Sequence, residues 1–163
     1  MSPIIPIRIS YPPIPMRSTR RLCIAALTFC LLSAFFSVAR AEISAAKVEA
    51  LVEALRLSAP EASAGLYSDW RVKADSIRSW SSRCLNQALT PEQFAADQAL
   101  ARQVLICVMG PVLRDQFTAS RENEIVAVQR AAAWWLGGDP EQYRSGSASA
   151  YTLKVLESYL RFF

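Results

Sequence analysis

An apolar run near the N-terminus divides this chain of 163 residues into two parts of different character. Residues 22–38 carry no charge, residues 17–21 before them include three arginines, and the sequence Ala39-Arg40-Ala41 follows. A basic segment, an apolar segment and an A-x-A site in this order are typical of a cleavable secretory signal peptide. We therefore predict an export signal over residues 1–41, with cleavage after Ala41, and one folded domain over residues 42–163.

The alternative interpretation of the apolar run is an uncleaved membrane anchor, because seventeen residues are close to the shortest span that crosses a bilayer. The small residues Ala39 and Ala41 fit the requirement of a signal peptidase and favour cleavage. Residues 1–15 are rich in proline and unlike the start of an export signal, whereas the basic cluster follows Met16 directly. We expect Met16 to be the true start of the chain.

The leader also accounts for the basic character of the whole sequence. Of the 18 basic residues, five arginines lie in residues 1–41, which leaves 13 basic against 14 acidic residues in the remainder, a net charge of −1. Proteins that bind nucleic acid gather positive charge to meet the phosphate backbone. The predicted mature domain has no such excess, so we expect no nucleic-acid partner.

Two of the four cysteines remain after the predicted cleavage, Cys84 and Cys107. An even pair in an exported domain usually forms a disulfide, and we predict this bond, with two buried thiols as the alternative. Cysteine Cα atoms must approach within about 7 Å. The bond therefore requires a helix that ends near Cys84, with the residues after it running back along the next helix.

Apolar residues after the leader recur at the spacing of helices and not at the alternation of strands. Val48, Leu51, Val52 and Leu55, for example, occupy positions i, i+3, i+4 and i+7 and so share one helix face. The whole pattern predicts helices over residues 44–57, 67–84, 90–117 with an interruption at 110–111, 120–137 and 149–161. The fold class is predicted to be all-α, a small bundle of about four to five helices with one disulfide.

Two of these helices have clear sequence signals at an end. Thr90, Pro91 and Gln93 have the spacing of a capping box with proline in the first turn, which predicts a helix start at Thr90. Gly137 follows the last apolar position of the fourth helix and is predicted to be its left-handed C-cap. Residues 137–148 then form the longest predicted loop.

The chain contains no histidine. This excludes Ser-His-Asp and Cys-His catalysis as well as zinc held by histidine. Two cysteines alone do not complete a structural zinc site, and a short acidic pair such as Asp139 and Glu141 lacks the ligand spacing of a calcium loop. We therefore expect no catalytic residue, no metal and no cofactor, and we keep a hydrolase that uses carboxylates from distant helices as an alternative.

The most distinctive stretch is residues 134–143, WWLGGDPEQY. Trp135 aligns with Ile125 and Val128 on a predicted buried face, which leaves its neighbour Trp134 at the edge of the helix. Tryptophan and tyrosine are frequent anchors of binding surfaces, so Trp134, Asp139 and Tyr143 are the candidate binding residues. The competing interpretation is that the tryptophans pack between helices and that Gly-Gly-Asp-Pro is only a helix stop and a turn. By the same helical spacing, Trp70 and Trp80 are predicted to lie in the core.

These exclusions favour a non-enzymatic interaction domain of the cell envelope, whose partner is another envelope protein. We expect it in the periplasm, although a thylakoid lumen or the extracellular space would suit the same sequence, and we expect it to meet the membrane only through its signal peptide. The alternative is a carrier with an aromatic cavity between its helices for a small apolar ligand. A closed apolar pocket would favour the carrier, and an exposed apolar patch would favour the interaction domain.

Overall fold

The structure, a computed structural model, describes residues 42–163, which belong to one compact unit. The predicted signal peptide, its cleavage residues Ala39 and Ala41 and the predicted start at Met16 lie outside the described residues.

The described part of the chain is a small all-α bundle, as the sequence predicts, and it also contains a minor hairpin that the sequence does not predict. Its elements in chain order are α2 (Ala45–Leu57), β1 (Leu66–Tyr67), β2 (Val72–Lys73), α3 (Ala74–Leu85), α4 (Pro91–Ala96), α5 (Gln98–Ala119), α6 (Glu124–Gly137), the 3₁₀ helix η2 (Pro140–Arg144) and α7 (Gly146–Leu160). The two strands pair antiparallel, with Leu66 opposite Lys73 and Tyr67 opposite Val72.

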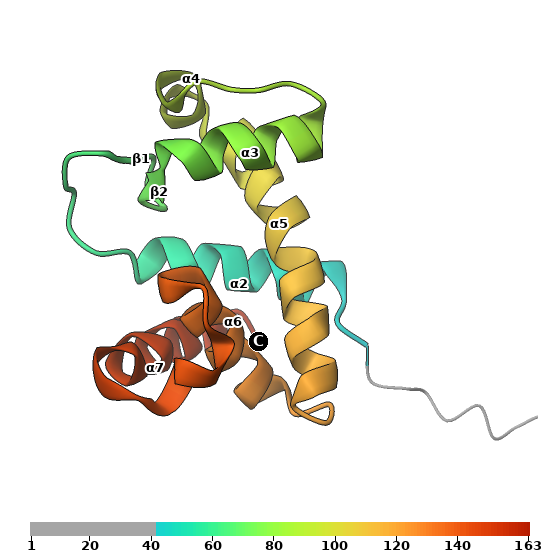
Figure 1. Cartoon of the computed structure of the whole chain (residues 1–163). Helices are drawn as coiled ribbons and strands as arrows, with labels where there is room; N and C mark the ends of the chain where they lie inside the picture. The colour runs from blue at the N-terminus through green and yellow to red at the C-terminus, as the bar shows by residue number, and fades with distance from the viewer. Residues whose placement is uncertain (1–41) are drawn as a thin grey trace, which may run out of the picture. The chain divides into compact units, whose positions relative to one another are not determined.

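The long helix α5 connects two layers of the bundle (Figure 1). Helices α3 and α4 pack near its N-terminal end, whereas α6 packs near its C-terminal end. Helix α2 crosses between these layers and contacts both α5 and α7. The fold therefore places the hairpin and α3 on one side of α2 and the α6–α7 pair on the other.

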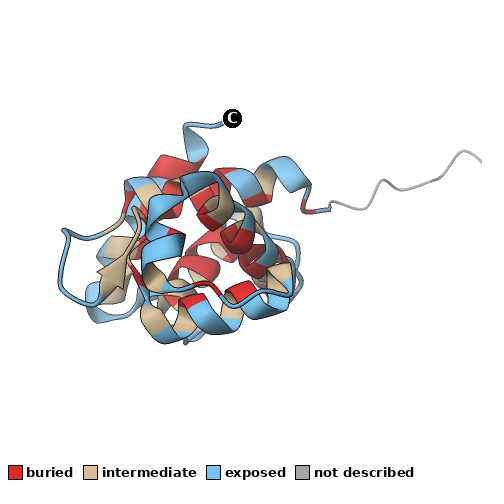
Figure 2. Cartoon of the chain, turned by 90° about the horizontal axis from the view of Figure 1, so that it is seen from above, coloured by how far each residue is buried: buried red, intermediate tan, exposed pale blue. Residues whose placement is uncertain are grey.

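The core forms where these helices face one another (Figure 2). The predicted apolar face of α2 is buried, with Leu51 and Val52 fully enclosed. The predicted face of the third helical segment is buried as well, including Phe94 and Leu105. Helical spacing therefore identified the two faces that meet at the centre of the molecule.

The predicted capping box is present, but the helix that it starts is short. The Thr90 hydroxyl accepts a hydrogen bond from Gln93 N, and the Gln93 side chain accepts one from Thr90 N. Helix α4 then ends at Asp97, whose backbone is extended and whose carboxylate accepts a hydrogen bond from Leu100 N at 2.9 Å. The prediction of one helix from Thr90 onward is wrong because Asp97 caps a second helix.

The predicted interruption at residues 110–111 is also wrong, since α5 continues through Pro111. A proline inside a helix removes the hydrogen bond to the carbonyl four residues earlier, here that of Cys107. Both residues lie on the exposed side of α5. Water can therefore donate to the Cys107 carbonyl in place of the missing N–H, and the helix continues past Pro111.

The predicted helix over residues 67–84 begins only at Ala74, because a β-hairpin occupies its first part. Ser68 and Arg71 in the hairpin turn have φ angles of 60° and 58°, and such left-handed backbone is incompatible with an α-helix. Trp70 lies between them and is buried. In the sequence, Trp70 stands at helical spacing from Ala74 and Ile77 of α3. This spacing therefore predicts a helix start that is too early.

The last two helices are shifted from their predicted bounds. Helix α6 starts after Asn123, whose side chain accepts a hydrogen bond from Val126 N, and not at residue 120. Its left-handed cap is Gly138 and not Gly137. Ile125, predicted to be buried, is 52% exposed and lines a hollow beside α7. Helix α7 begins at residue 146, before the predicted 149, and η2 lies within the predicted loop.

The predicted Cys84–Cys107 pair is at disulfide distance, with Cα atoms 6.1 Å apart. The geometric condition is met, because Asn86 ends α3 in a left-handed conformation and the chain turns back toward α4. Only Ile77 and Ser81 of α3 are buried. Trp80, Cys84 and Leu85 add partly buried contacts with the core, and the disulfide is the covalent attachment of α3 to α5.

Reduction of this disulfide is expected to destabilise the protein by about 3.5 kcal/mol, the chain-entropy value for a loop of this length. Thermal unfolding followed by circular dichroism, with and without dithiothreitol, measures the effect. The double variant Cys84→Ser/Cys107→Ser serves as the control. It should unfold at the temperature of the reduced protein, and dithiothreitol should not change its unfolding temperature. An unfolding temperature that reductant leaves unchanged in the unaltered protein would contradict this account.

Candidate functional site

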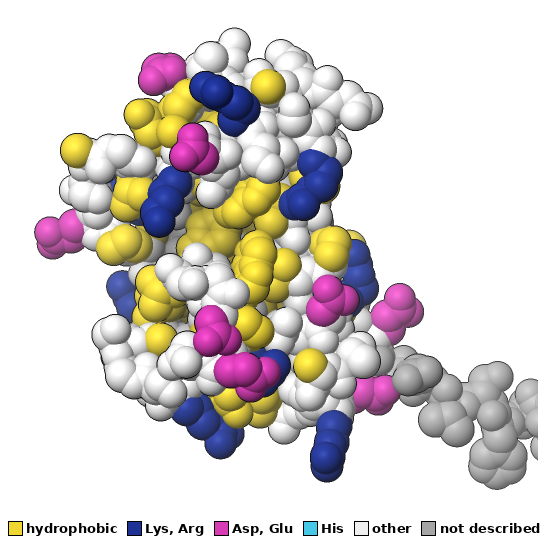
Figure 3. Space-filling model, viewed as in Figure 1, with side chains coloured by type: hydrophobic (Ala, Val, Ile, Leu, Met, Phe, Trp, Pro, Cys, Tyr) yellow, Lys and Arg dark blue, Asp and Glu magenta, His cyan; other side chains and the backbone are white. Residues whose placement is uncertain are grey.

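An apolar groove of about 410 Å³ crosses one face of the molecule between α3 and the α6–α7 pair. Figure 3 shows hydrophobic side chains gathered in this hollow. We call it the tryptophan groove, and its walls include Trp70, Trp80, Trp134, Trp135, Leu136 and Tyr151. All four tryptophans of the sequence therefore line a single site, although they come from the hairpin, α3 and α6.

Two tryptophans join the walls of the groove. The ring of Trp80 on α3 lies against that of Trp135 on α6, with centroids 5.8 Å apart and a 36° angle between the planes. Aromatic pairs in tilted contact attract each other beyond their burial. Both side chains are half-buried, so each tryptophan, predicted to lie in the core, is instead part of a wall that meets solvent. Trp134 is half-buried beside them, at the edge of α6 as predicted.

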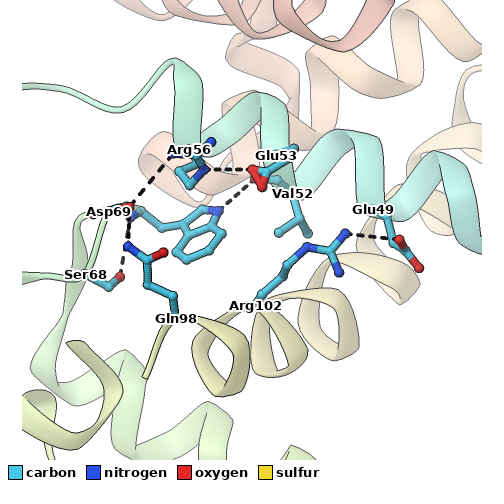
Figure 4. Close-up of polar contacts among 9 residues, drawn as sticks. Glu49, Val52, Glu53, Arg56, Ser68, Asp69, Gln98 and Arg102 are labelled. Carbon is cyan, nitrogen blue, oxygen red and sulfur yellow. Dashed lines mark hydrogen bonds and ion pairs between the residues drawn. The ribbon is translucent and has the colours of Figure 1, made fainter. Parts of the chain in front are cut away.

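Trp70 fastens the hairpin wall to α2. It is 2% exposed, and its indole N–H donates a hydrogen bond of 2.8 Å to the carbonyl of Val52. Figure 4 shows this bond together with the polar contacts around it. The prediction that Trp70 is buried is correct. Trp70 lies in the turn between β1 and β2, however, and not on the apolar face of a helix.

Polar contacts outside the groove hold the same wall (Figure 4). The carboxylate of Asp69 accepts a hydrogen bond from the Gln98 side chain at 2.7 Å and lies 3.9 Å from Arg56. Arg56 also pairs with Glu53 at 2.7 Å, and this hydrogen bond is the main reason why the pKa of Arg56 is raised. The hairpin is thus tied to α2 and α5.

The charged side chains that line the groove are both cations. Arg71 donates to the carbonyl oxygens of Ser68 at 3.2 Å and Pro60 at 3.4 Å. The ammonium group of Lys73 has no hydrogen-bond or ion-pair partner among residues 42–163. No acidic side chain of residues 42–163 lines the groove. Both charges in the lining are therefore positive, although residues 42–163 as a whole carry a slight negative charge.

The groove also presents hydrogen-bond donors without acceptors. The indole N–H groups of Trp80, Trp134 and Trp135 bond to no other group in residues 42–163, and none of them is fully buried. Tyr151 is packed deeply enough that burial raises its pKa above the ordinary value, which keeps its hydroxyl protonated. A ligand in the groove would therefore meet donors on several sides of an otherwise apolar surface.

The structure separates Trp134 from the other two residues that the sequence singles out. Asp139 caps η2, since its carboxylate accepts hydrogen bonds from Glu141 N at 2.9 Å and from the Gln142 side chain at 3.3 Å. The ring of Tyr143 lies 4.9 Å from the guanidinium carbon of Arg144. Neither Asp139 nor Tyr143 lines the tryptophan groove.

Arg130 holds η2 against α6 on this side of the molecule. Its guanidinium donates two hydrogen bonds to Glu141 and lies 5.9 Å from the centre of the Tyr143 ring. The hydrogen bonds raise the pKa of Arg130 and lower that of Glu141. The loop that follows Trp134 is therefore organised by its own contacts, in which Tyr143 and Asp139 both take part.

A second hollow of about 380 Å³ lies at the C-terminal end of α7. Ile125, Leu160 and Phe163 line it, together with a chain of paired polar groups. The Lys47 ammonium and the Tyr159 hydroxyl each donate a 2.6 Å hydrogen bond to the carboxylate of Glu124. These groups are already paired with one another, so the second hollow offers a ligand mainly apolar contact.

The Glu124 network also determines its ionisation. Burial raises the pKa of Glu124, but the hydrogen bonds from Lys47 and Tyr159 and the charge of Lys47 together lower it below the ordinary value. Burial, followed by the hydrogen bond to Glu124, raises the pKa of Tyr159. At neutral pH the carboxylate is therefore charged and the phenol neutral, which is the state that joins α2, α6 and α7.

Within residues 42–163, no cluster of three or more histidine, cysteine or acidic side chains is placed to hold a metal ion. No helix in the same range is long and apolar enough to cross a membrane. Comparisons of the chain with protein-family models, with curated proteins and with solved structures find no match. The chemistry of the tryptophan groove is therefore the basis for a functional proposal.

Sequence reasoning identified Trp134 but missed the groove around it. Trp80 and Trp135 are 55 positions apart and meet only through tertiary packing. The available signal was in α3, where Trp80 and Ile77 are the only large apolar side chains of the central turns, among serines and arginines. A tryptophan on so polar a helix is a poor candidate for a core position.

Trp70→Phe is expected to lower the free energy of unfolding by about 1–3 kcal/mol, because the substitution removes the bond to the buried Val52 carbonyl. Trp80→Phe is the matched control, since the Trp80 indole N–H has no acceptor to lose, and its effect should be clearly smaller. Urea unfolding followed by circular dichroism measures both variants. Equal losses would show that the Trp70 hydrogen bond does not fasten the hairpin.

Glu124→Gln is expected to lower the unfolding temperature at neutral pH. The folded-state pKa of Glu124 lies below its unfolded value, so the charged carboxylate stabilises the fold at neutral pH and loses this effect as the pH falls through the folded pKa. The difference from the unaltered protein should therefore shrink in acid. Thermal unfolding between neutral pH and the acidic range tests this, with exposed Glu157→Gln as a control. A difference that stays constant with pH would contradict the prediction.

Proposed function

We propose that residues 42–163 form a non-enzymatic domain that binds an extended apolar segment of another cell-envelope protein in the tryptophan groove. The observation that carries the proposal is the gathering of all four tryptophans around one open groove. Tryptophan dominates the energetics of many binding surfaces because its large ring buries much area with few rotatable bonds.

The size of the groove suits a short segment rather than a whole protein face. A volume of about 410 Å³ is near the lower end of ligand sites, which span roughly 300–1,000 Å³. The groove is partly open to solvent along the face seen in Figure 3. This opening supports a peptide over a fully enclosed ligand, because an extended chain can enter an open groove without a change in the fold.

The unmatched donors favour a peptide over a hydrocarbon ligand. A purely apolar molecule would cover the indole N–H groups of Trp80, Trp134 and Trp135 and leave them without water or any acceptor. Each polar group desolvated in this way weakens binding. The carbonyl oxygens of a peptide backbone recur along its length and can accept from such donors. The carrier of a small apolar ligand is therefore the second candidate.

The lining of the groove also favours binding over catalysis. Acid–base chemistry by carboxylates needs two acidic groups that converge on one reacting molecule, and no acid lines the groove. The compartment is part of the proposal as well. A disulfide between Cys84 and Cys107 suits an oxidising environment, and together with the leader predicted from the sequence it supports export, with the periplasm as the proposed location.

Photo-cross-linking in living cells tests the proposal. A benzophenone amino acid replaces Leu136, which lines the groove and is 48% exposed. The matched control replaces Leu153, a leucine of similar exposure at 53% on α7 that does not line the groove. We expect a discrete protein adduct from position 136 and none from 153, with the linked peptide mapping to one apolar segment.

A synthetic peptide of the linked segment should then compete with cross-linking at position 136. A small-molecule adduct at this position would overturn the proposal in favour of the carrier. The proposal is also wrong if position 136 gives no adduct in cells where an established envelope complex cross-links normally.

A further inference from the structure

We infer that the segment bound in the tryptophan groove carries a carboxylate beside its apolar side chains, and that Arg71 and Lys73 hold this carboxylate. The inference rests on the proposed function and specifies the chemistry of the partner. It begins from charge complementarity, because both charged side chains that line the groove are cations and no acid lies among them.

The two cations share one wall of the groove. Arg71 ends the hairpin turn, Lys73 ends β2 and directly precedes α3, and one residue separates them. Both side chains line the groove. A single carboxylate, or two adjacent ones, can therefore meet both groups without crossing the groove.

Neither cation is neutralised within the domain. Arg71 bonds to two backbone carbonyl oxygens, which fix its guanidinium but carry no charge. Lys73 has no partner among residues 42–163. Some other cations do have acidic partners, as Lys47 has Glu124 and Arg102 has Glu49. Others, such as Arg78 and Lys154, have none within residues 42–163 but do not line the groove. Arg71 and Lys73 differ from both groups, because they are adjacent, have no acidic partner and line an apolar groove.

The backbone around these cations adds to the positive potential. Helix α3 begins directly after Lys73, and no side chain caps its first N–H groups. The N-terminal end of a helix carries partial positive charge and favours an anion. Asp75 lies in the first turn of α3 and offsets part of this charge, but it is exposed and does not line the groove. The charged side chains of the lining itself are still both positive.

A random peptide library displayed on phage is the probe, and the target is the protein purified from cells in the form to which they process it. We expect enrichment of peptides that combine leucine or aromatic residues with a neighbouring aspartate or glutamate. Two partly exposed ion pairs predict about tenfold tighter binding of such a peptide than of its asparagine or glutamine analogue. The preference should fall at high salt, which screens exposed charges.

Variants locate the acid preference. Arg71→Asn and Lys73→Gln remove the charges. Asparagine is chosen at position 71 because the backbone there has a φ of 58°, a left-handed conformation that asparagine adopts more readily than most residues. The double variant should still select apolar peptides but lose the acid preference. Arg78→Gln and Lys154→Gln remove two exposed charges that do not line the groove, and this control should keep the acid preference. Circular dichroism checks that both double variants are folded.

The outcomes separate the inference from the function on which it rests. Selection of apolar peptides without acidic residues would overturn the inference and leave the proposed function standing. An acid preference that survives Arg71→Asn/Lys73→Gln would also overturn it, since other groups would then hold the carboxylate. Failure to select any peptide that competes for the groove would overturn the proposed function and the inference together.

Discussion

The covalent link between Cys84 and Cys107 is the constraint on which the tryptophan groove depends. Helix α3 forms one wall of the groove and fully buries only Ile77 and Ser81. Its other apolar side chains, Trp80, Cys84 and Leu85, are only partly buried against the core. The disulfide fixes its C-terminal end to α5. At its N-terminal end, the hairpin is seated on α2 by the hydrogen bond from Trp70 to Val52. A helix held at both ends can leave a hydrophobic side chain such as Trp80 at the surface.

Because α3 is attached at its two ends, the space between α3 and the α6–α7 pair can stay open as the tryptophan groove and is not filled by core side chains. The hairpin and α3 meet α2 and α5, and the α6–α7 pair meets them from the other side (Figure 1). The contact of Trp80 with Trp135 bridges these two sides without closing the space between them. The half-buried tryptophans weaken the case for a purely structural role, because the part of their aromatic area that faces solvent does little for stability and supports association. The disulfide and the Trp70–Val52 hydrogen bond therefore position the α3 and hairpin wall of the groove, including its two cations.

Local patterns predicted the parts of the fold that depend on local interactions. The face of α2 around Leu51, the capping box at Thr90 and the geometry of the disulfide all follow from short-range spacing and reach. The hairpin did not, because Trp70 is placed by a carbonyl of α2, and its spacing in the sequence imitates a helix. The candidate site was predicted only at Trp134. Asp139 and Tyr143 are close to it in sequence, but η2 draws them into contacts of its own, whereas the partner tryptophan Trp80 comes from a distant helix. Tertiary packing alone brings these groups together.

The most direct test of the account uses the four tryptophan indole N–H signals in a ¹⁵N-resolved NMR spectrum of the protein. The signals are assigned by single Trp→Phe variants, and the spectrum is recorded before and after addition of a peptide that the groove binds. The account predicts that the Trp70 signal exchanges slowly with water and stays in place, since its N–H is bonded to Val52, whereas those of Trp80, Trp134 and Trp135 shift together. A shift of Trp70 alone, or three groove signals that do not move when peptide binds, would contradict it.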